Sequence, residues 1–453
     1  MGTAALNVEE QPSVWQTGVR EAFCPPLDGS VNADFAVVGA GFSGLAAAYF
    51  LRRAEPRARI VVLDAGRVGC GASGRSAGLV SPEFNVSLKA TARAHGKQRA
   101  REAFRYMEHA VEVVEQLVMH NRIACGYRRA GMLRIATAPA HERRLHEEMD
   151  LANRMRIGSA QWLSPAAVKA RVDGPRFCGA TWEPRAAQVD PFALALGLKA
   201  VLQQAGVQFF ECCPVVRLEK RIGRLFARTP KGGVLAEKVA ITTNAYSRRF
   251  GGLRGKQVPL TMHAMASEPI PAERLDALGW REREAISDAR RFGTFYLLTP
   301  DARLVVGSRE AGLLAALGRG ARSTFERLER DVAAMFPSLG ELRFPHRWSG
   351  PVSATFELEP ALGYLGSKRM VYSLGCMGRG IALAHLNGWT MADLLLEERT
   401  ERTEVFFVNR TVIPWPPGPL QLVLAAAMRA LMMVEDAWHE RPRCAQLWRG
   451  RKQ

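Results

Sequence analysis

The chain has 453 residues, of which 47% are hydrophobic and 23% charged. This length suffices for two domains with substantial cores, and the composition excludes an intrinsically disordered chain. The formal net charge of +18 allows two interpretations, an acidic partner or an arginine-rich composition, and the low share of lysine (ten of the 62 basic residues) favours the second.

The eight cysteines include no C-x-x-C pair and no Cys/His cluster with zinc-ligand spacing, so we expect reduced thiols and no metal site. The N-terminus lacks a basic segment followed by an apolar run, and no stretch has 18 uninterrupted apolar residues. The sequence therefore predicts a cytoplasmic protein.

Residues 34–64 contain the first informative motif. The apolar run 35–38 predicts a strand buried on both faces, and Gly39-Ala40-Gly41-Phe42-Ser43-Gly44 opens a helix-like stretch. A second strand, 59–63, ends on Asp64. In this pattern Gly39 allows the tight turn, Gly41 lets the backbone approach a pyrophosphate, and Gly44 lets the helix pack on the strand. The carboxylate of Asp64 is placed to bind ribose hydroxyls, so we predict a dinucleotide site.

A second glycine-rich loop, Gly71-Ala72-Ser73-Gly74-Arg75-Ser76-Ala77-Gly78, follows only seven residues after Asp64. A domain that binds only NAD would use this segment for a helix and a third strand. A second loop of small residues suits a longer ligand that continues past the pyrophosphate toward a ring. The two loops together favour FAD over NAD.

The segment 89–118 predicts one long amphipathic helix. Apolar residues form one face, and basic residues recur at every fourth position on another. This basic stripe consists of Lys89, Arg93, Lys97, Arg101 and Arg105. A solvated surface is the expected role of the stripe, and docking of an acidic partner or RNA is the alternative.

Further strands are expected over 207–211, 215–220, 225–229 and 234–242, with a turn at Lys231-Gly232-Gly233. Residues 292–307 predict a hairpin that turns at Pro300-Asp301. Near the end of the chain, 370–374 predicts a strand, and Gly378-Arg379-Gly380 begins a helix. The N-terminus of that helix would stabilise negative charge on a ligand.

The sequence resembles the FAD-dependent amine and amino-acid oxidoreductases of the D-amino acid oxidase superfamily, most of all the gamma-glutamylputrescine oxidase group. The resemblance extends from about Val14 to Ala437 and is carried by six ordered motifs. These are GAGFSG with Asp64-Ala65, GASGRSAG, Gln188-Val189-Asp190-Pro191, Thr243-Asn244-Ala245-Tyr246, Arg347-Trp348-Ser349-Gly350 and the stretch Tyr372 to Ile381.

The resemblance implies an α/β fold with an FAD-binding Rossmann-like domain of glutathione-reductase type, interleaved with an α+β substrate domain built on an antiparallel sheet. We assign 31–90, 185–258 and 345–400 to the FAD-binding domain, 91–184 and 259–344 to the capping domain, and 401–453 to a C-terminal linker and helix. FAD is expected to bind noncovalently. The expected FAD-binding residues are Gly39, Gly41, Phe42, Ser43, Gly44, Asp64, Ala65, Gly71, Ala72, Ser73, Arg75, Ser76, Gly78, Val216, Asn244, Ala245, Gly350, Gly378, Arg379, Gly380 and Ile381.

The chain departs from the family pattern at two positions. Arg379 stands where the family usually has histidine, and arginine supplies fixed charge but cannot accept a proton. Val352 stands in the stretch where relatives that oxidise small α-amino acids carry a carboxylate-binding arginine. The segment in which covalent relatives carry their flavin-linked cysteine has none here, and Cys376 matches a cysteine of the noncovalent relatives.

These features predict an enzyme that oxidises the C–N bond of an amine by hydride transfer to flavin, with O₂ as the expected acceptor. The expected substrate-pocket residues are Arg379, Trp348 and Tyr296, with His263 a weaker candidate. One alternative is a D-amino acid or opine dehydrogenase whose substrate carboxylate is held by Arg379. A tRNA-modifying flavoprotein that uses the basic stripe is less favoured.

The C-terminal segment begins with Pro414-Trp415-Pro416-Pro417-Gly418-Pro419, which predicts a stiff linker. The following residues, Leu420–Val434, predict an apolar helix that is too short and too charged to cross a membrane. Packing against the protein is expected, and peripheral membrane contact is a minor alternative.

Overall fold

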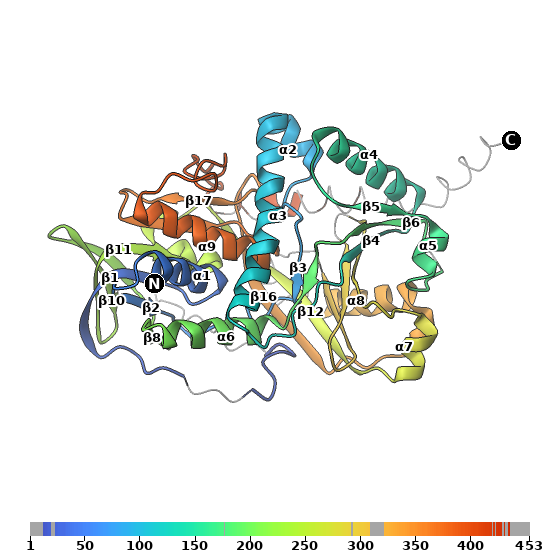
Figure 1. Cartoon of the computed structure of the whole chain (residues 1–453), viewed down its shortest axis with the longest axis horizontal. Helices are drawn as coiled ribbons and strands as arrows, with labels where there is room; N and C mark the ends of the chain where they lie inside the picture. Colours follow the sequence, from blue (N-terminus) through green and yellow to red (C-terminus); the bar gives the residue numbers. More distant parts are fainter. Residues whose placement is uncertain are drawn as a thin grey trace.

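The computed structural model describes residues 12–19, 23–175, 177–290, 293–308 and 321–418, together with 420–421, 423–427, 430 and 434. Two eight-stranded sheets lie side by side, and the long helix α3 (Lys97–His120) runs between the two halves of the molecule (Figure 1). Among the described residues, no helix is both long enough and apolar enough to span a bilayer.

The first sheet confirms the predicted parallel core. Its main strand order is β17 (Ala361–Tyr364), β18 (Met370–Leu374), β11 (Gly232–Ile241), β1 (Gly29–Val38), β2 (Ile60–Leu63) and β8 (Gln208–Phe210). Strand β1 is parallel to β2 and β11, and β11 is parallel to β18. The antiparallel strands β9 (Arg217–Arg221) and β10 (Arg224–Thr229) complete the expected strand series and pair with β11 through β10.

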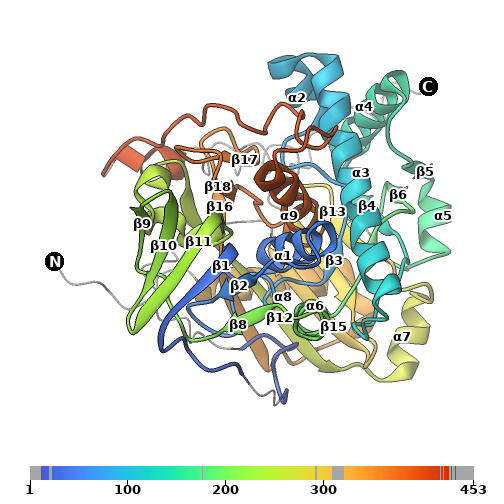
Figure 2. The same ribbon diagram turned by 60° about the vertical axis from the view of Figure 1, so that its left-hand side comes forward.

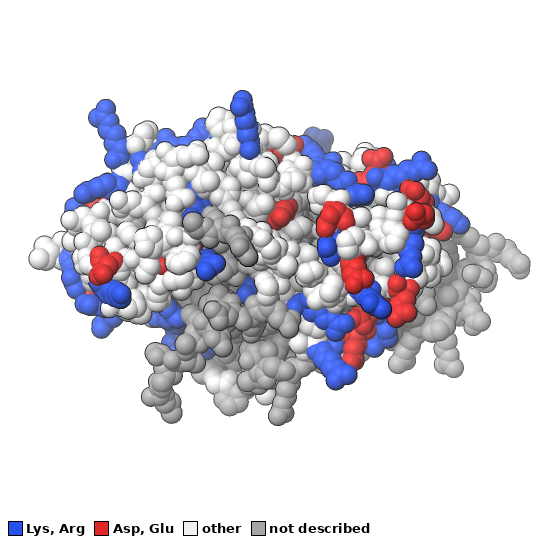
Figure 3. All heavy atoms as spheres, turned by 90° about the horizontal axis from the view of Figure 1, so that it is seen from below, with Lys and Arg blue, Asp and Glu red and all other residues white. Residues whose placement is uncertain are grey.

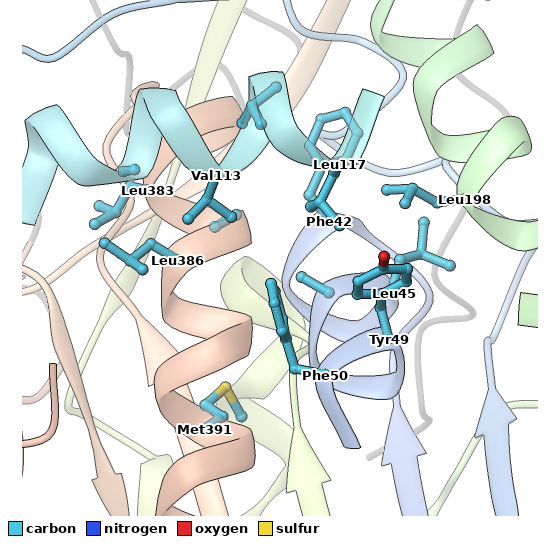
Figure 4. Close-up of a cluster of buried hydrophobic side chains, with 14 of the residues drawn as sticks. Phe42, Leu45, Tyr49, Phe50, Val113, Leu117, Leu198, Leu383, Leu386 and Met391 are labelled. Atoms are coloured by element: carbon cyan, nitrogen blue, oxygen red, sulfur yellow. The ribbon is translucent and has the colours of Figure 1, made fainter. Parts of the chain in front are cut away.

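Both faces of the first sheet are buried, as the continuous apolar runs predicted. On one face α1 (Phe42–Ala54), α3 and α9 (Gly380–Leu396) pack against one another, and α6 (Pro191–Gln204) joins them (Figure 2). Figure 4 shows the interdigitated side chains, including Phe42 and Phe50 from α1, Leu117 from α3 and Leu386 from α9. This packing fixes the first turn of α1 and the first turn of α9 relative to each other.

The second sheet has the order β16 (His346–Ala354), β12 (Val258–Pro269), β15 (Arg303–Ser308), β14 (Thr294–Leu298), β13 (Ala285–Asp288), β4 (Met132–Ala136), β6 (Gly179–Glu183) and β5 (Gln161–Leu163). All pairings are antiparallel except that of β4 with β13. The predicted hairpin is confirmed as β14 and β15. Helices α5 (Pro165–Lys169), α7 (Ala272–Leu278) and α8 (Ala321–Met335) contribute to the apolar layer on one face.

Two assignments along the chain are corrected by packing. Strand β16 was expected in the FAD-binding part, but it pairs with β12 over nine residues and so belongs to the second sheet. Helix α3 was expected in the capping part, but its buried face packs with α1 and α9. The domain boundaries were placed from sequence motifs. Such motifs do not show which sheet a nearby strand joins or which helices a nearby helix packs against.

The single helix expected over 89–118 is two helices, α2 (Leu88–His95) and α3, because Gly96 between them has φ = +85°. The basic stripe is interrupted at this glycine. Lys89 contacts Glu147 at 3.3 Å, and Arg101 donates to the carbonyl of Met155 at 2.9 Å. Two of the stripe's five side chains are therefore engaged by other groups of the protein. On the opposite face, seen from below in Figure 3, acidic and basic side chains lie close together on the right of the view.

The expected C-terminal linker is anchored to the body of the protein. Trp415 is 5% exposed, and its indole Nε1 donates to the carbonyl of Ala354 at 3.1 Å. Its ring also meets Phe356 edge-on at 5.3 Å. Nine of the fifteen residues of the helix expected over Leu420–Val434 are described, and all nine are helical. Ala425 packs against the cluster that contains Trp415, in agreement with the expected packing against the protein.

Candidate active site

A cavity of about 990 Å³ connects the two sheets. Its walls come from the ends of β1 and β2, the second glycine loop, β12, β16, the first turn of α9, and α4 (Pro139–Met155) above the second sheet. Most of the predicted FAD-binding residues line it, so segments far apart in the sequence meet at one site.

The first glycine motif forms one end of this cavity. Gly39 has φ = +109°, and a Cβ on Gly41 would lie 2.9 Å from the Ser73 hydroxyl oxygen. A Cβ on Gly44 would lie only 1.9 Å from the carbonyl oxygen of Gly39, so Gly44 allows α1 to pack closely against the turn. The three glycines therefore have the geometry that the sequence pattern predicted.

The first turn of α1 is suited to bind phosphate. Its N-cap residue, Gly41, offers no side chain to the free amides, and the first turn contains no acidic residue. The Ser73 hydroxyl, which belongs to the second glycine loop, accepts a hydrogen bond from the Phe42 amide at 3.0 Å. The two glycine loops thus meet at a helix N-terminus, which favours an anionic ligand.

Asp64 lies at the end of β2 and is held in one orientation. Its Oδ2 accepts from the amide of Ala40 at 2.6 Å, and its Oδ1 accepts from the amide of Gly66 at 2.8 Å. Burial raises the pKa of this carboxyl group, although the two amide hydrogen bonds act in the opposite direction. Each oxygen keeps a further lone pair, so Asp64 can accept from ribose hydroxyls.

The second glycine loop is tied to the second sheet through Arg75. Its Nη1 donates to the carbonyl of Ser349 at 3.0 Å, and the indole of Trp348 donates to the carbonyl of Arg75 at 2.8 Å. Gly78, which has φ = +92°, does not line the cavity. A Cβ there would lie 2.3 Å from the carbonyl oxygen of Val189, so Gly78 serves close packing against the Gln188–Pro191 segment.

The other end of the cavity is formed by the start of α9. Gly378 has φ = +81°, and Arg379 is the N-cap residue of the helix. Gly380 and Ile381 line the cavity in its first turn. Asn244 donates to the sulfur of Cys376 at 3.2 Å, and burial raises the pKa of this thiol. Cys376 is therefore a protonated thiol at neutral pH.

Three charged side chains that the sequence did not single out line the cavity together with Arg379; they are Glu83, Arg134 and Glu148. Arg379 forms an ion pair with Glu83, which follows strand β3 (Leu79–Val80). Arg134 of β4 forms an ion pair with Glu148 of α4 at 2.6 Å, and all four side chains line the cavity. Arg134 had a sequence signal, because it is the one charged residue in the apolar stretch Met132–Ala136. Glu83 had none.

Trp348 and His263 line the cavity as expected, and the Nδ1 atom of His263 lies 2.6 Å from the hydroxyl oxygen of Ser349. Tyr296 does not line it. This residue is fully buried on the opposite face of the second sheet, where its ring meets Phe336 edge-on at 5.1 Å. Its neighbour Phe295 lines the cavity instead, because consecutive side chains in a strand point to opposite faces.

Val216, whose backbone is expected to contact the adenine, is not among the residues that line the cavity. Its side chain is exposed outside the cavity, and its amide donates to the carbonyl of Arg228 at 2.8 Å. Val215, one residue earlier, lines the cavity. For Tyr296 the segment was correct and the residue was wrong by one position.

The shape and donors of the cavity fit FAD. Added Cβ atoms at Gly41 and Gly378 would come within about 3 Å of side chains, so these glycines keep the surface open for a closely fitting ligand. Two helix N-termini, at α1 and α9, supply amide donors toward the two ends. The α1 end suits the pyrophosphate, with Asp64 at the ribose, and the α9 end suits the ring that gains negative charge on reduction.

Comparison with known proteins agrees with this site. Residues 34–394 match the family model described as "DAO: FAD dependent oxidoreductase". Gamma-glutamylputrescine oxidoreductase of Escherichia coli is 27% identical over 410 residues, which cover 89% of this chain and 92% of the relative. The probable oxidoreductase OrdL of Haemophilus influenzae is 26% identical and covers 84% of this chain and 87% of its own length.

Solved structures agree on the fold. Glycine oxidase from Geobacillus kaustophilus has a TM-score of 0.71 at 21% identity, covering 84% of this chain and 100% of that one. L-amino acid deaminase from Proteus myxofaciens has a TM-score of 0.70 at 16% identity, covering 86% of this chain and 96% of that one. Since the family model spans most of the sequence and the cavity fits the cofactor, the chain belongs to the DAO family of FAD-dependent oxidoreductases.

Proposed function

We propose that the chain oxidises the C–N bond of an amine, of the polyamine type or a secondary amine, and that O₂ accepts the electrons. The observation that carries this proposal is the cavity wall at β16, where Val352 lines the site in place of a carboxylate-binding arginine. A small α-amino acid would lose a charge-assisted, bidentate contact there.

FAD, when bound, supplies the hydride acceptor, and the resulting imine hydrolyses in water. The protein binds and orients the amine. Trp348, Phe295, Met262 and Val352 provide an apolar lining that excludes water near the start of α9. Holding the substrate C–H bond in one orientation in a dry pocket accounts for much of the rate such a site can achieve.

Positive charge at α9 would stabilise negative charge that appears on the cofactor during the reaction. The helix N-terminus supplies part of it, and Arg379 supplies the rest. Arginine cannot accept a proton, so Arg379 acts by charge alone. Its ion pair with Glu83 moderates that charge.

The curated relatives support an amine or amino-acid substrate, since one is named a gamma-glutamylputrescine oxidoreductase. The second candidate, a D-amino acid or opine dehydrogenase with the carboxylate held by Arg379, is weakened by Glu83. This carboxylate already contacts the Nη1 of Arg379. An Arg379→Ala variant that raises KM for amino acids but not for amines would favour the second candidate.

The direct test is anaerobic addition of amines to the purified yellow protein. Polyamines, N-methyl amines and D-amino acids are added in turn, and flavin absorbance is recorded. We expect bleaching by at least one class of amine and recovery of the colour on admission of air. Absence of bleaching across the whole panel would contradict the proposal. Bleaching without recovery of the colour in air would show that the electron acceptor is not O₂.

A further inference from the structure

The C-terminal helix, Leu420–Val434, turns an apolar stripe toward solvent. Its exposed positions recur at intervals of three and four residues, which is one face of a helix. This outer stripe consists of Leu420, Val423, Ala427, Ala430 and Val434. Leu420 and Val423 are each 64% exposed, and Val434 is 67% exposed. A helix on the surface of a globular domain ordinarily has polar side chains on this side, so the pattern is inverted here.

The opposite face of the same helix is already packed on the protein. At 100° per residue, Gln421, Leu424 and Ala425 lie on the side away from the outer stripe, and all three are half-buried. Ala425 packs against the cluster that contains Trp415. The protein therefore covers the side with the polar glutamine, and the outer stripe is left for a partner.

A group of basic side chains lies beside the start of this helix. The amide of Trp415 donates to the carbonyl of Gly255 at 2.8 Å, so the chain around Gly255 adjoins the C-terminal segment. Residues 238–267 include five lysine or arginine residues and no acidic residue. Three of them are exposed and form no ion pair with another described residue; these are Arg248, Arg249 and Arg254, here called the basic loop. Residues 441–453 add five further basic residues and no acidic one.

An apolar stripe next to unpaired arginines matches one kind of partner. Nucleic acid would bind the arginines but leave the outer stripe in water. A second copy of this chain would bring like charges together, and one stripe of five side chains falls short of the roughly 800 Å² per partner of a standard interface. An anionic lipid surface satisfies both features, because its phosphates attract arginines and its acyl boundary accepts apolar side chains.

We propose that the outer stripe and the basic loop together dock the protein on an anionic lipid surface. The helix is too short to cross a bilayer and lies in the plane of the interface. It follows residue 394, where the match to the family model ends, so the shared fold does not account for it. Met377 packs against the same cluster as Ala425 and also lines the cavity. The docking face is therefore close to the α9 end of the cavity.

Sedimentation with lipid vesicles tests the proposal directly. The full chain, loaded with FAD, is mixed with vesicles of phosphatidylcholine alone or of equal parts of phosphatidylcholine and phosphatidylglycerol. We expect binding to the anionic vesicles to be at least about tenfold tighter, because two or three arginines near the surface each contribute to the attraction. Added salt should weaken this binding, since it screens the arginines.

Two variants separate the two parts of the docking face. Val423→Glu places a charge in the outer stripe and should weaken binding to anionic vesicles by at least about tenfold. Arg248→Gln combined with Arg254→Gln should weaken it by about tenfold or more and reduce the preference for anionic lipid. Flavin absorbance verifies that each variant is folded.

Each variant has a matched control on another surface. Ile222→Glu introduces the same acid at a fully exposed apolar position in the turn between β9 and β10. Arg93→Gln combined with Lys97→Gln removes two exposed charges at the junction of α2 and α3. Both controls should bind anionic vesicles as wild type does.

Three results would overturn the proposal. The first is wild-type protein that does not sediment with anionic vesicles. The second is Val423→Glu that binds them as tightly as wild type, which would show that charge alone attracts the protein. The third is a dimer of wild type in solution that Val423→Glu dissociates, as measured by light scattering without vesicles, because a second copy would then cover the outer stripe.

Discussion

Glu83 and Arg379 contact each other across the cavity at the start of α9. Removing the acid leaves the arginine uncompensated, so Glu83→Gln should stabilise the negatively charged reduced cofactor. We expect the flavin midpoint potential to rise by about 30 mV, equivalent to about 1.4 kcal/mol for two electrons. Sulfite, which forms an anionic flavin adduct, should bind more tightly. Glu115→Gln, which removes one partner of an exposed ion pair, is the control, and a fall in potential in Glu83→Gln would contradict the prediction.

His385 predicts a pH dependence of stability. This fully buried residue lies on α9, and its Nδ1 is 2.6 Å from the carbonyl oxygen of Ile381. Burial lowers the pKa of His385 from 6.5 to about 4. Between these two values the unfolded chain binds more protons than the folded one, so the free energy of unfolding rises with pH across this window.

The expected gain between pH 4 and 6.5 is up to about 3 kcal/mol. It is measured by urea denaturation at several pH values. His385→Gln removes the titrating group, so its stability profile should be flatter over the same window. An identical slope in variant and wild type would show that another group is responsible.

At the scale of the element, Gly44 decides whether α1 can lie against β1. A methyl group at this position would lie 1.9 Å from the carbonyl oxygen of Gly39, which is backbone and cannot rotate away. Gly44→Ala should therefore displace the first turn of α1, lose FAD and destabilise the fold by about 1–3 kcal/mol or more. Flavin content after purification and thermal unfolding measure the two effects. Gly251→Ala, where the added methyl meets no atom within 4 Å, should change neither.

The elements also show what sequence could and could not predict. The strands and helices with strong apolar patterns, such as β1, α1, β11, β18 and α9, were predicted correctly because their local pattern and their final burial agree. Gly96 was overlooked because the periodicity of 89–118 continues through it, and only its positive φ divides the helix. Tyr296 was wrong by one residue, since strand facing depends on a register that is set by partner strands.

At the scale of the whole molecule, Trp415 attaches the C-terminal segment to the second sheet. It is buried against Ala354 and Val258 at the ends of β16 and β12. Trp415→Ala should lower the free energy of unfolding by about 3–5 kcal/mol, because it removes a large buried side chain and an indole hydrogen bond. Chemical denaturation measures this loss. Ile222→Ala, at a fully exposed hairpin position, should have almost no effect.

The sequence by itself determined the cofactor end of this protein. The glycine turns, Asp64 and the late glycine-rich stretch lie within short segments, and their chemistry requires particular residues at fixed spacing. Only the tertiary structure showed which charged side chains line the cavity beyond the proposed cofactor site. Two ion pairs line this part of the cavity, Glu83 with Arg379 and Arg134 with Glu148. Their four residues come from four separate segments, so the pairing is visible only in the folded structure. Charge pairing and strand facing across a cavity depend on distances through space, and no local pattern in one chain specifies them.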